Sequence, residues 1–577
     1  MAPALATGPE RRDAPRAATR GSGPDIARSS RATSGMGETG DAAARFGLGC
    51  KEFHVAPMID VSTVEFRYFI RLLTKRAVIW NQMVVAETLV HRSHHNNKKA
   101  CLDQESRAPS SIEDDEIELT DDLRRFCGWW DGHGDVTPHP TVCQIGSNSP
   151  REAAFATRVV RKCGYDSIDL NCECPSDRVA GRSFGAALMK DGEATAEIVS
   201  AMLTQAARPQ RSGTGRDEDK TPLPVSVKTR IGVDEHDTFD FIANFVRGLV
   251  TAGCRHFVIH ARKVYTQGLS PAQNRDVPPI DYPRAYRLVE TFPQCSFVIN
   301  GGIRSLEHAR EVAFGTAIQF DSRGVAEEKH CVSDDISADH AVPCRRCNRP
   351  QGSCLHPPRV APANLRGVMV ARLARDRPAE LADVDRYFYG AAANPCRNRR
   401  EVMERYLSFL EREYPRRCCD DVAAHTLGMA REMRLVHDKP FCAICREFRG
   451  RTAESAAWHA GDRTAWENSS EGIAAPQAVV GRHQSGKRSR RHAKYGGAKI
   501  VTRIVDRALA PTHGILAGEA GQKAFRRASH DLSRDGTVRN CGPGYILWKA
   551  MRAAPDEVWD RPFDLSGVKT TTYYPTK

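Results

Sequence analysis

The sequence predicts a TIM barrel, a parallel eight-stranded sheet that closes into a cylinder inside a ring of helices. Eight short runs rich in apolar and β-branched residues occur between residues 53 and 372. Amphipathic stretches separate many of these runs, and this alternation is typical of repeated strand–helix units. Polar residues follow most of the runs, at the strand ends where such barrels carry their functional sites. We therefore expect an α/β chain whose strand ends converge on one site.

Each strand is expected where apolar or β-branched residues form a run that polar, Gly or Pro residues end. In chain order these runs cover residues 53–56, 78–83, 141–146, 167–171, 225–230, 256–261, 296–300 and 367–372. Helices are expected in the amphipathic stretches, several of which have apolar residues at spacings of three and four. In chain order they cover residues 64–75, 150–163, 193–207, 238–252, 283–292 and 305–314.

The chain of 577 residues is too long for one ordinary domain. Its first 49 residues, rich in Ala, Gly, Ser and Arg, are expected to form a disordered tail or a transit peptide, although Glu10, Asp13 and Asp25 weigh against the second. Long irregular insertions predict disorder. The expected divisions are a barrel at 50–375 with insertions at 99–139, 208–221 and 315–365, a helical domain at 376–416 and 500–566, and an irregular basic insertion at 417–499.

The 84 Lys and Arg against 71 Asp and Glu give a formal net charge of +13, which favours polyanionic partners. The 19 cysteines follow no disulfide framework, and no apolar run could span a membrane. We expect an intracellular monomer with reduced thiols and no membrane association, cytoplasmic unless the tail directs it to a mitochondrion or plastid.

The pairs Cys344/Cys347 and Cys442/Cys445 lie about a hundred residues apart, so no metal site is expected. The basic run 487–494 is expected to be solvated, with contact to RNA phosphates or a nuclear signal as the alternatives.

Cys174 lies just beyond the run at 167–171, at an expected strand end. A thiol with an ordinary pKa of about 8.5 is mostly protonated at neutral pH, so it can donate a proton or, if activated, attack. The cysteine opens the segment 174–179, Cys-Pro-Ser-Asp-Arg-Val. Further motifs are Ala56-Pro57-Met58, Gln144-Ile145-Gly146, Phe-Gly-Ala at 184–186, Val-Lys-Thr-Arg-Ile-Gly at 227–232, His-Ala-Arg-Lys at 260–263, and Gly-Leu-Ser-Pro at 268–271 with Asn274 and Arg275.

These motifs resemble those of the tRNA-dihydrouridine synthases, and within them the A-type branch. The resemblance covers about 50–314 and 366–414, and more loosely 503–563. It implies a flavoprotein oxidoreductase of tRNA processing that binds FMN, is reduced by NADPH, and converts a uridine near position 20 of the tRNA D-loop to dihydrouridine. It also implies that the C-terminal helices bind tRNA.

The resemblance implies a role for each site residue. Cys174 would be the general acid. Residues expected around FMN are Pro57, Met58, Gln144, Lys228, His260, Asn300, Gly301, Gly302, Ala371 and Arg372. Residues expected to contact the substrate uracil or tRNA are Asn171, Arg262, Asn274, Arg275, Arg526 and Arg527, with at least one of the last two facing solvent.

The chain departs from the family pattern at three places. Glu173 stands where the family usually has Gly, and a carboxylate there is expected to keep the neighbouring thiol protonated and to crowd the substrate loop. The segment 180–183 is short, and Ala371 replaces a glycine. Two other functions remain open: a small-molecule flavin oxidoreductase on the same barrel, and a tRNA-binding homologue that has lost catalysis through Glu173.

Overall fold

The computed structural model describes residues 51–96, 117, 119–132, 136–175, 184–208, 221–315, 318–320, 326–328, 360–414, 503–539 and 542–563. The predicted tail at 1–49, the insertion at 417–499 and most of those at 208–221 and 315–365 lie outside these residues. The short segment 180–183, the two cysteine pairs and the basic run also lie outside them. Within the described residues, no helix has the length and apolar character needed to cross a membrane.

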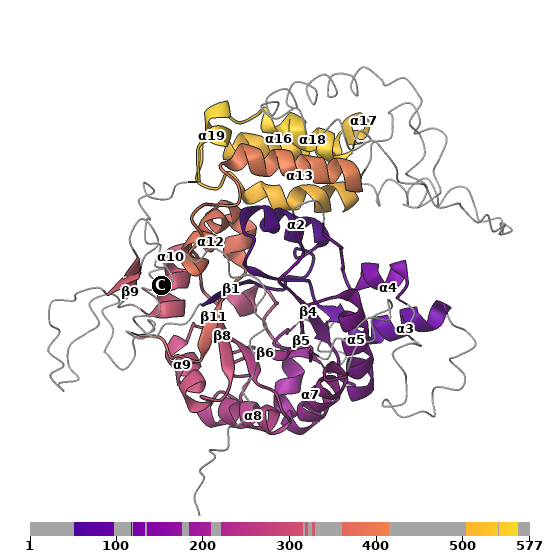
Figure 1. The fold of residues 1–577 in the computed structure, drawn as a ribbon, viewed down its shortest axis with the longest axis vertical. Helices are drawn as coiled ribbons and strands as arrows, with labels where there is room; N and C mark the ends of the chain where they lie inside the picture. Colours follow the sequence, from indigo (N-terminus) through magenta and orange to yellow (C-terminus); the bar gives the residue numbers. More distant parts are fainter. Residues whose placement is uncertain are drawn as a thin grey trace, which may run out of the picture.

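Eight parallel strands close into a barrel, which confirms the predicted fold class (Figure 1). Each strand pairs with the next around the cylinder, and the last pairs with the first, Glu52 opposite Gly367. A further short strand, β3 (Val84–Val85), extends the pairing along β4. The barrel strands are β1 (Glu52–Val55), β2 (Val78–Trp80), β4 (Thr141–Gly146), β5 (Ser167–Cys172), β6 (Val225–Arg230), β7 (His256–His260), β8 (Ser296–Asn300) and β11 (Leu365–Val370).

Six helices follow strands of the barrel and match the predicted stretches to within two residues at each end. They are α2 (Val64–Leu73), α5 (Pro150–Cys163), α7 (Gly192–Ala206), α8 (Phe239–Thr251), α9 (Tyr282–Thr291) and α10 (Leu306–Phe314). Each begins after a Ser, Thr or Asp whose side chain accepts a hydrogen bond from a first-turn N–H. Such caps satisfy N–H groups that the helix itself leaves unpaired, which explains why the starts are so well defined.

Alternate residues of each strand point into the barrel, as the two-residue period of a strand requires. One interior layer is apolar and is formed by Ala56, Trp80, Val142, Val258, Val298 and Met369. Two residues further along three of these strands are Gln144, His260 and Asn300. The barrel interior therefore changes from apolar to polar toward the carboxyl ends of its strands, and the polar layer lies where the site was predicted.

The prediction of disorder is wrong for the second half of the 99–139 insertion. It contains the helix α4 (Asp121–Phe126), and Leu123 and Cys127 are fully buried against the barrel helices. Barrel side chains also bind its backbone: the Asn81 amide and the Tyr165 hydroxyl both donate to the carbonyl of Cys127, at 3.1 and 2.6 Å. Apolar burial and these hydrogen bonds together offset the entropy cost of ordering the segment.

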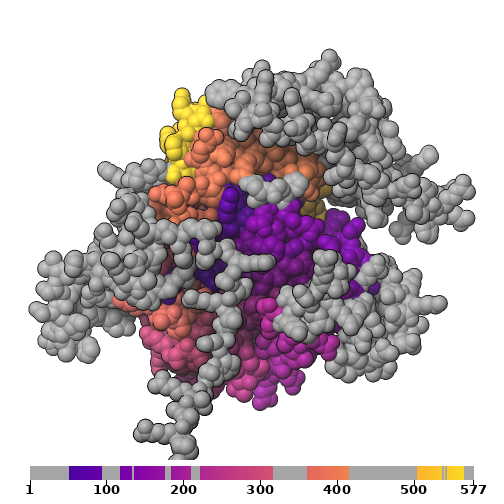
Figure 2. All heavy atoms as spheres, viewed as in Figure 1, coloured from indigo at the N-terminus to yellow at the C-terminus, as the bar shows by residue number. Residues whose placement is uncertain are grey.

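A group of C-terminal helices packs beside the barrel. It comprises α13 (Arg399–Glu413), α16 (Gln522–Arg534), α18 (Pro543–Met551), α19 (Asp556–Asp560) and a helix at 503–509, and we call it the helical bundle. Its core contains Tyr406, Phe525 and Trp559, all nearly fully buried. The orange α13 lies against the indigo α2 of the barrel (Figures 1 and 2), where Tyr68 of α2 stacks on Phe409 of α13 with ring centroids 4.0 Å apart. Barrel and bundle therefore share a continuous apolar interface.

Between the barrel and the bundle lies a buried carboxylate, Glu65 of α2. It accepts hydrogen bonds from the hydroxyl of Tyr414 and from Nε of Arg507, the latter at 2.9 Å. We predict that Glu65→Gln lowers the free energy of unfolding by about 1–2 kcal/mol in urea titrations, since hydrogen bonds to a charged group weaken and half-exposed Arg507 limits the effect. The exposed Glu290 near the end of α9 offers a control, Glu290→Gln. Equal effects of the two substitutions would contradict a stabilising role for this contact.

Candidate active site

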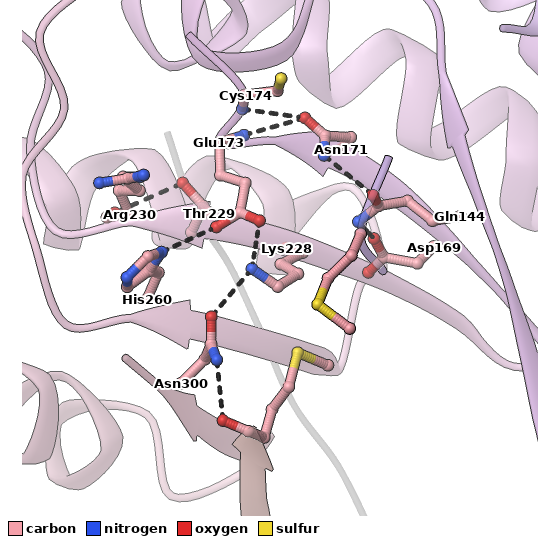
Figure 3. Close-up of polar contacts among 12 residues, drawn as sticks. Gln144, Asp169, Asn171, Glu173, Cys174, Lys228, Thr229, Arg230, His260 and Asn300 are labelled. Carbon is pink, nitrogen blue, oxygen red and sulfur yellow. Dashed lines mark hydrogen bonds and ion pairs between the residues drawn. The ribbon is translucent and has the colours of Figure 1, made fainter. Parts of the chain in front are cut away.

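The polar layer at the carboxyl ends of the strands begins with a chain of hydrogen bonds on β4 and β5. The amide of Asn171 donates to Gln144 Oε1 at 3.0 Å, and Gln144 Nε2 donates to Asp169 Oδ2 at 2.9 Å (Figure 3). Ser226 of β6 donates to the other oxygen of Asp169 at 2.7 Å. All four side chains are buried, so this network fixes the predicted residues Gln144 and Asn171 in position.

The centre of the site is a buried cluster of Lys228, Glu173 and His260 (Figure 3). Lys228 Nζ forms an ion pair with Glu173 Oε1 and donates to Asn300 Oδ1 at 3.2 Å. The second oxygen of Glu173 lies 3.2 Å from His260 Nδ1. Asn300 is held in turn by donation from its amide to the carbonyl of Met369 at 2.8 Å. The structure thus brings together three residues predicted to surround a flavin, with Glu173 between two of them.

Burial and charge determine the protonation states in this cluster. Burial alone would raise the pKa of Glu173, but Lys228 and the hydrogen bond from His260 outweigh it and hold the pKa well below its usual range. Burial, followed by the nearby Arg230, lowers the pKa of His260 to about 3, so the imidazole is neutral at pH 7. A carboxylate can only accept, so the neutral ring must carry its proton on Nδ1 and leave Nε2 unprotonated. Removing one partner of a buried ion pair typically costs about 3–5 kcal/mol.

Cys174 points away from this cluster (Figure 3). It is partly exposed, whereas the seven other cysteines of the described residues are buried. Asn171 Oδ1 accepts from the backbone N–H of both Glu173 and Cys174, at 3.2 and 3.1 Å, and so shapes the turn that directs the two side chains apart. Burial lowers the pKa of the Arg230 guanidinium, and the charge of Glu173 partly offsets this shift.

A glycine turn follows β8, as predicted. Gly301 and Gly302 have φ of 113° and 71°, values that other residues rarely adopt. A Cβ on Gly301 would lie 2.6 Å from the ring of His260, and one on Gly302 would lie 3.0 Å from Ile280. Ala371, by contrast, has φ of −122°, so its position does not require glycine. The glycines therefore let the backbone of this turn pack closely against His260 and Ile280.

Positive charge gathers beside this turn, around the carboxylate of Asp276. Arg372 binds its Oδ1, and Arg304 Nη2 lies 3.6 Å from the same oxygen. Burial and then Arg372 lower the pKa of Arg262 to about 10, and burial and Arg372 also lower the pKa of Arg275. This gathering of guanidiniums around Asp276 forms a setting that favours an anion such as a phosphate.

Two residues that are predicted to contact tRNA form hydrogen bonds within the protein. Asn274 is fully buried, and its side chain binds the backbone of Tyr265 through the N–H at 2.8 Å and the carbonyl at 2.9 Å. Arg262 is largely buried and donates to the carbonyl of Pro278. Both side chains therefore hold the loop that follows β7. Sequence reasoning found these residues, but their internal partners are backbone carbonyls that leave no pattern in the sequence.

The remaining predicted residues lie in two places, in the turn after β1 and on helix α16 of the helical bundle. Pro57 and Met58 follow β1 directly and are half-buried, and Ser62 holds this turn by accepting from the N–H of Met58 at 3.0 Å. Arg526 and Arg527 are exposed on α16 in the helical bundle, away from the barrel strands (Figure 1). The prediction that they face solvent is confirmed.

Comparison with known proteins identifies the family. The family model described as Dihydrouridine synthase (Dus) matches residues 54–319. The tRNA-dihydrouridine(20/20a) synthase of Vibrio parahaemolyticus serotype O3:K6 is 30% identical over 387 residues, 66% of this chain and 86% of the relative. Proteins of the same name from Shewanella oneidensis and Salmonella typhi are 34% identical over 265 and 270 residues, covering 45% and 46% of this chain and 63% and 65% of theirs. The chain belongs to the tRNA-dihydrouridine synthase family.

The sequence predicts that the carboxylate of Glu173 keeps the neighbouring thiol of Cys174 protonated. The structure instead directs the carboxylate into the barrel, toward Lys228 and His260, while the thiol faces the other way (Figure 3). The reason is the turn held by Asn171, which places consecutive side chains on opposite sides of the backbone. In this member of the dihydrouridine synthase family, the Glu173 side chain therefore contacts two residues that are predicted to surround the flavin, Lys228 and His260.

Sequence reasoning did not single out Asp169, and the structure makes it a buried acid. Burial raises its pKa to about 8, despite hydrogen bonds from Gln144 and Ser226 and the charge of Lys228. The unfolded state has an ordinary Asp pKa of about 3.9, so between about pH 4 and pH 8 the folded state binds more protons than the unfolded state. Stability conferred by the protonated acid is therefore lost as pH rises through this window.

We predict that Asp169→Asn removes this pH dependence. The free energy of unfolding of the wild type should fall relative to that of the variant as pH rises from 5 to 8, by at most about 1.4 kcal/mol per pH unit. Urea unfolding at several pH values would measure the difference. Asp191→Asn, at the exposed cap of α7, changes one charge without touching the barrel interior and serves as the control. A constant difference between wild type and Asp169→Asn would show that Asp169 is ionised throughout.

Proposed function

We propose that this protein is an FMN-dependent tRNA-dihydrouridine synthase that uses NADPH to reduce a D-loop uridine to 5,6-dihydrouridine. Membership of the family supports the reaction class, and the relatives carry positions 20 and 20a in their names. The observation that carries the proposal is the placement of a partly exposed thiol, Cys174, at the carboxyl end of β5, next in the chain to the residue that pairs with buried Lys228. An acid next to a cofactor site is what reduction of a carbon–carbon double bond requires.

Apart from Glu173, the residues of the site fit FMN in their chemistry. Lys228 and His260 would contact the flavin ring, and the ammonium of Lys228 would stabilise negative charge on it. The glycine turn at Gly301 and Gly302, with Arg372 beside it, would hold the phosphate, because backbone N–H groups and a guanidinium both suit that anion. When bound, FMN would accept a hydride from NADPH and supply it to C6 of the uracil.

Cys174 would complete the reaction by giving its proton to C5 of the uracil. The base gains one hydride and one proton, and the thiolate left on Cys174 is reprotonated from solvent, which its partial exposure permits. The substrate base must first leave its stack to reach the barrel mouth. Arg275, which is exposed, would bind the base or an adjacent phosphate.

We propose the helical bundle as the tRNA-binding domain. Arg526 and Arg527 are exposed on α16, and Arg527 has only a long contact with Asp531, at 3.6 Å, so both can reach phosphates. A small-molecule flavin oxidoreductase on the same barrel would have no use for such a surface. The net charge of +13 further supports a polyanionic substrate.

Substitution of Cys174 tests the proposed reaction. With FMN, NADPH and tRNA that lacks dihydrouridine, Cys174→Ala should form dihydrouridine about 10²- to 10⁴-fold more slowly than wild type, because positioned acid catalysis contributes about that much. Reduction of the flavin by NADPH, followed by absorbance, should remain unchanged because it does not need the thiol. Cys172→Ala, two residues away and fully buried, is the control and should keep most of the activity. Equal loss of both half-reactions in Cys174→Ala would assign the thiol a structural role.

The double variant Arg526→Ala/Arg527→Ala tests the RNA surface. It should bind tRNA more weakly, and the slope of log K against log salt should shrink by about 0.7–0.9 for each phosphate that the variant no longer neutralises. Filter binding at several salt concentrations would measure both quantities. Because the two side chains are exposed, the variant should unfold at the same urea concentration as wild type. Unchanged affinity and slope would rule out this face of α16 as a tRNA-binding surface.

A further inference from the structure

The side chain of Glu173 binds the two residues that are proposed to contact the flavin ring, Lys228 and His260. Its two oxygens take up one donor on Lys228 and the Nδ1–H of His260. These are the two side chains proposed to contact the ring edge of FMN. The Glu173 side chain is 15% exposed and that of Lys228 only 1%, so the contact lies inside the barrel mouth and not at its rim.

The competition is sharpest at His260. A neutral imidazole has a single N–H, and Glu173 binds it on Nδ1, so Nε2 can only accept. The carbonyl oxygens of a flavin ring are themselves acceptors, and they find no donor on this histidine while Glu173 is in place. His260 cannot easily turn away, because its ring lies against Gly301, where even a Cβ would come within 2.6 Å of it.

The charge of Lys228 gives a second reason why Glu173 and a flavin compete for this site. Its other described partner is the neutral oxygen of Asn300, at 3.2 Å, so Glu173 supplies the negative charge that this buried ammonium requires. Electron-rich flavin atoms would have to replace that carboxylate or share the ammonium with it. Sharing would place a buried carboxylate beside the part of the ring that gains negative charge on reduction, which is unfavourable.

We propose that Glu173 is an internal ligand of the flavin site, which occupies the donors of Lys228 and His260 in the free protein and must swing out before FMN binds. This inference rests on the proposed FMN dependence. Glu173 follows β5 on a turn of three residues, so rotation of its side chain is sufficient and no strand has to move. The free chain is thereby stabilised at the cost of flavin affinity.

Flavin titration of Glu173→Gly measures this competition directly. The dissociation constant of FMN, from quenching of flavin fluorescence, should fall at least about tenfold relative to wild type. Glu173→Gln, which keeps the volume but removes the charge, should lie between the two. Without FMN, the melting temperature of Glu173→Gly should be lower than that of wild type, and FMN should raise it by more, because its binding then supplies the missing partner of Lys228.

Glu65→Gln provides the matched control, since it alters another buried, paired carboxylate far from the site and should leave FMN affinity unchanged. Equal or weaker FMN binding by Glu173→Gly, with clear binding by wild type, would overturn the inference and leave the proposed function intact. Failure of both proteins to bind FMN would overturn the proposed function itself.

Discussion

A buried ammonium on the inner face of the barrel is the constraint on which the site depends. Lys228 is 1% exposed, and a charge so far from water has to be matched by acceptors within the protein. Asn300 supplies a neutral oxygen from β8 and Glu173 supplies a carboxylate from the end of β5. Each of these acceptors is oriented in turn, Asn300 by the backbone of β11 and Glu173 by the turn that Asn171 holds. The need to neutralise one side chain thus organises residues from β5, β6, β8 and β11.

The barrel makes this arrangement possible through its period of two. Strand residues that face inward alternate with residues that pack against the helices, so one strand contributes an apolar residue low in the barrel and a polar one at its mouth. Val258 and His260 on β7, and Val298 and Asn300 on β8, show this change along a single strand. Closure of the sheet then brings the ends of the first strand, β1, and the last, β11, to one face. The helical bundle adds a second, separate surface through its packing on α2.

Much of the fold was predictable because its signals are local. Strand runs ended by polar residues, and helices begun by Ser, Thr or Asp caps, locate each element without knowledge of its neighbours. Cys174, Lys228 and His260 were predictable for a related reason, since the carboxyl ends of barrel strands must meet. The features that the sequence did not predict depend on tertiary contacts. Asn274 binds backbone groups that any sequence would present, and the second half of the 99–139 insertion is ordered by partners such as Asn81 and Tyr165.

Glu173 shows most clearly which features the sequence alone does not predict. Its position next to Cys174 in the sequence suggested an effect on the thiol, but the direction of its side chain is decided by a turn of three residues and by the charge of Lys228.

The central claim about function is that this chain makes dihydrouridine in tRNA. Nucleoside mass spectrometry of bulk tRNA from cells that lack the gene tests it most directly. We expect dihydrouridine to fall and to be restored by the wild-type gene, whereas an unchanged dihydrouridine content would contradict the claim.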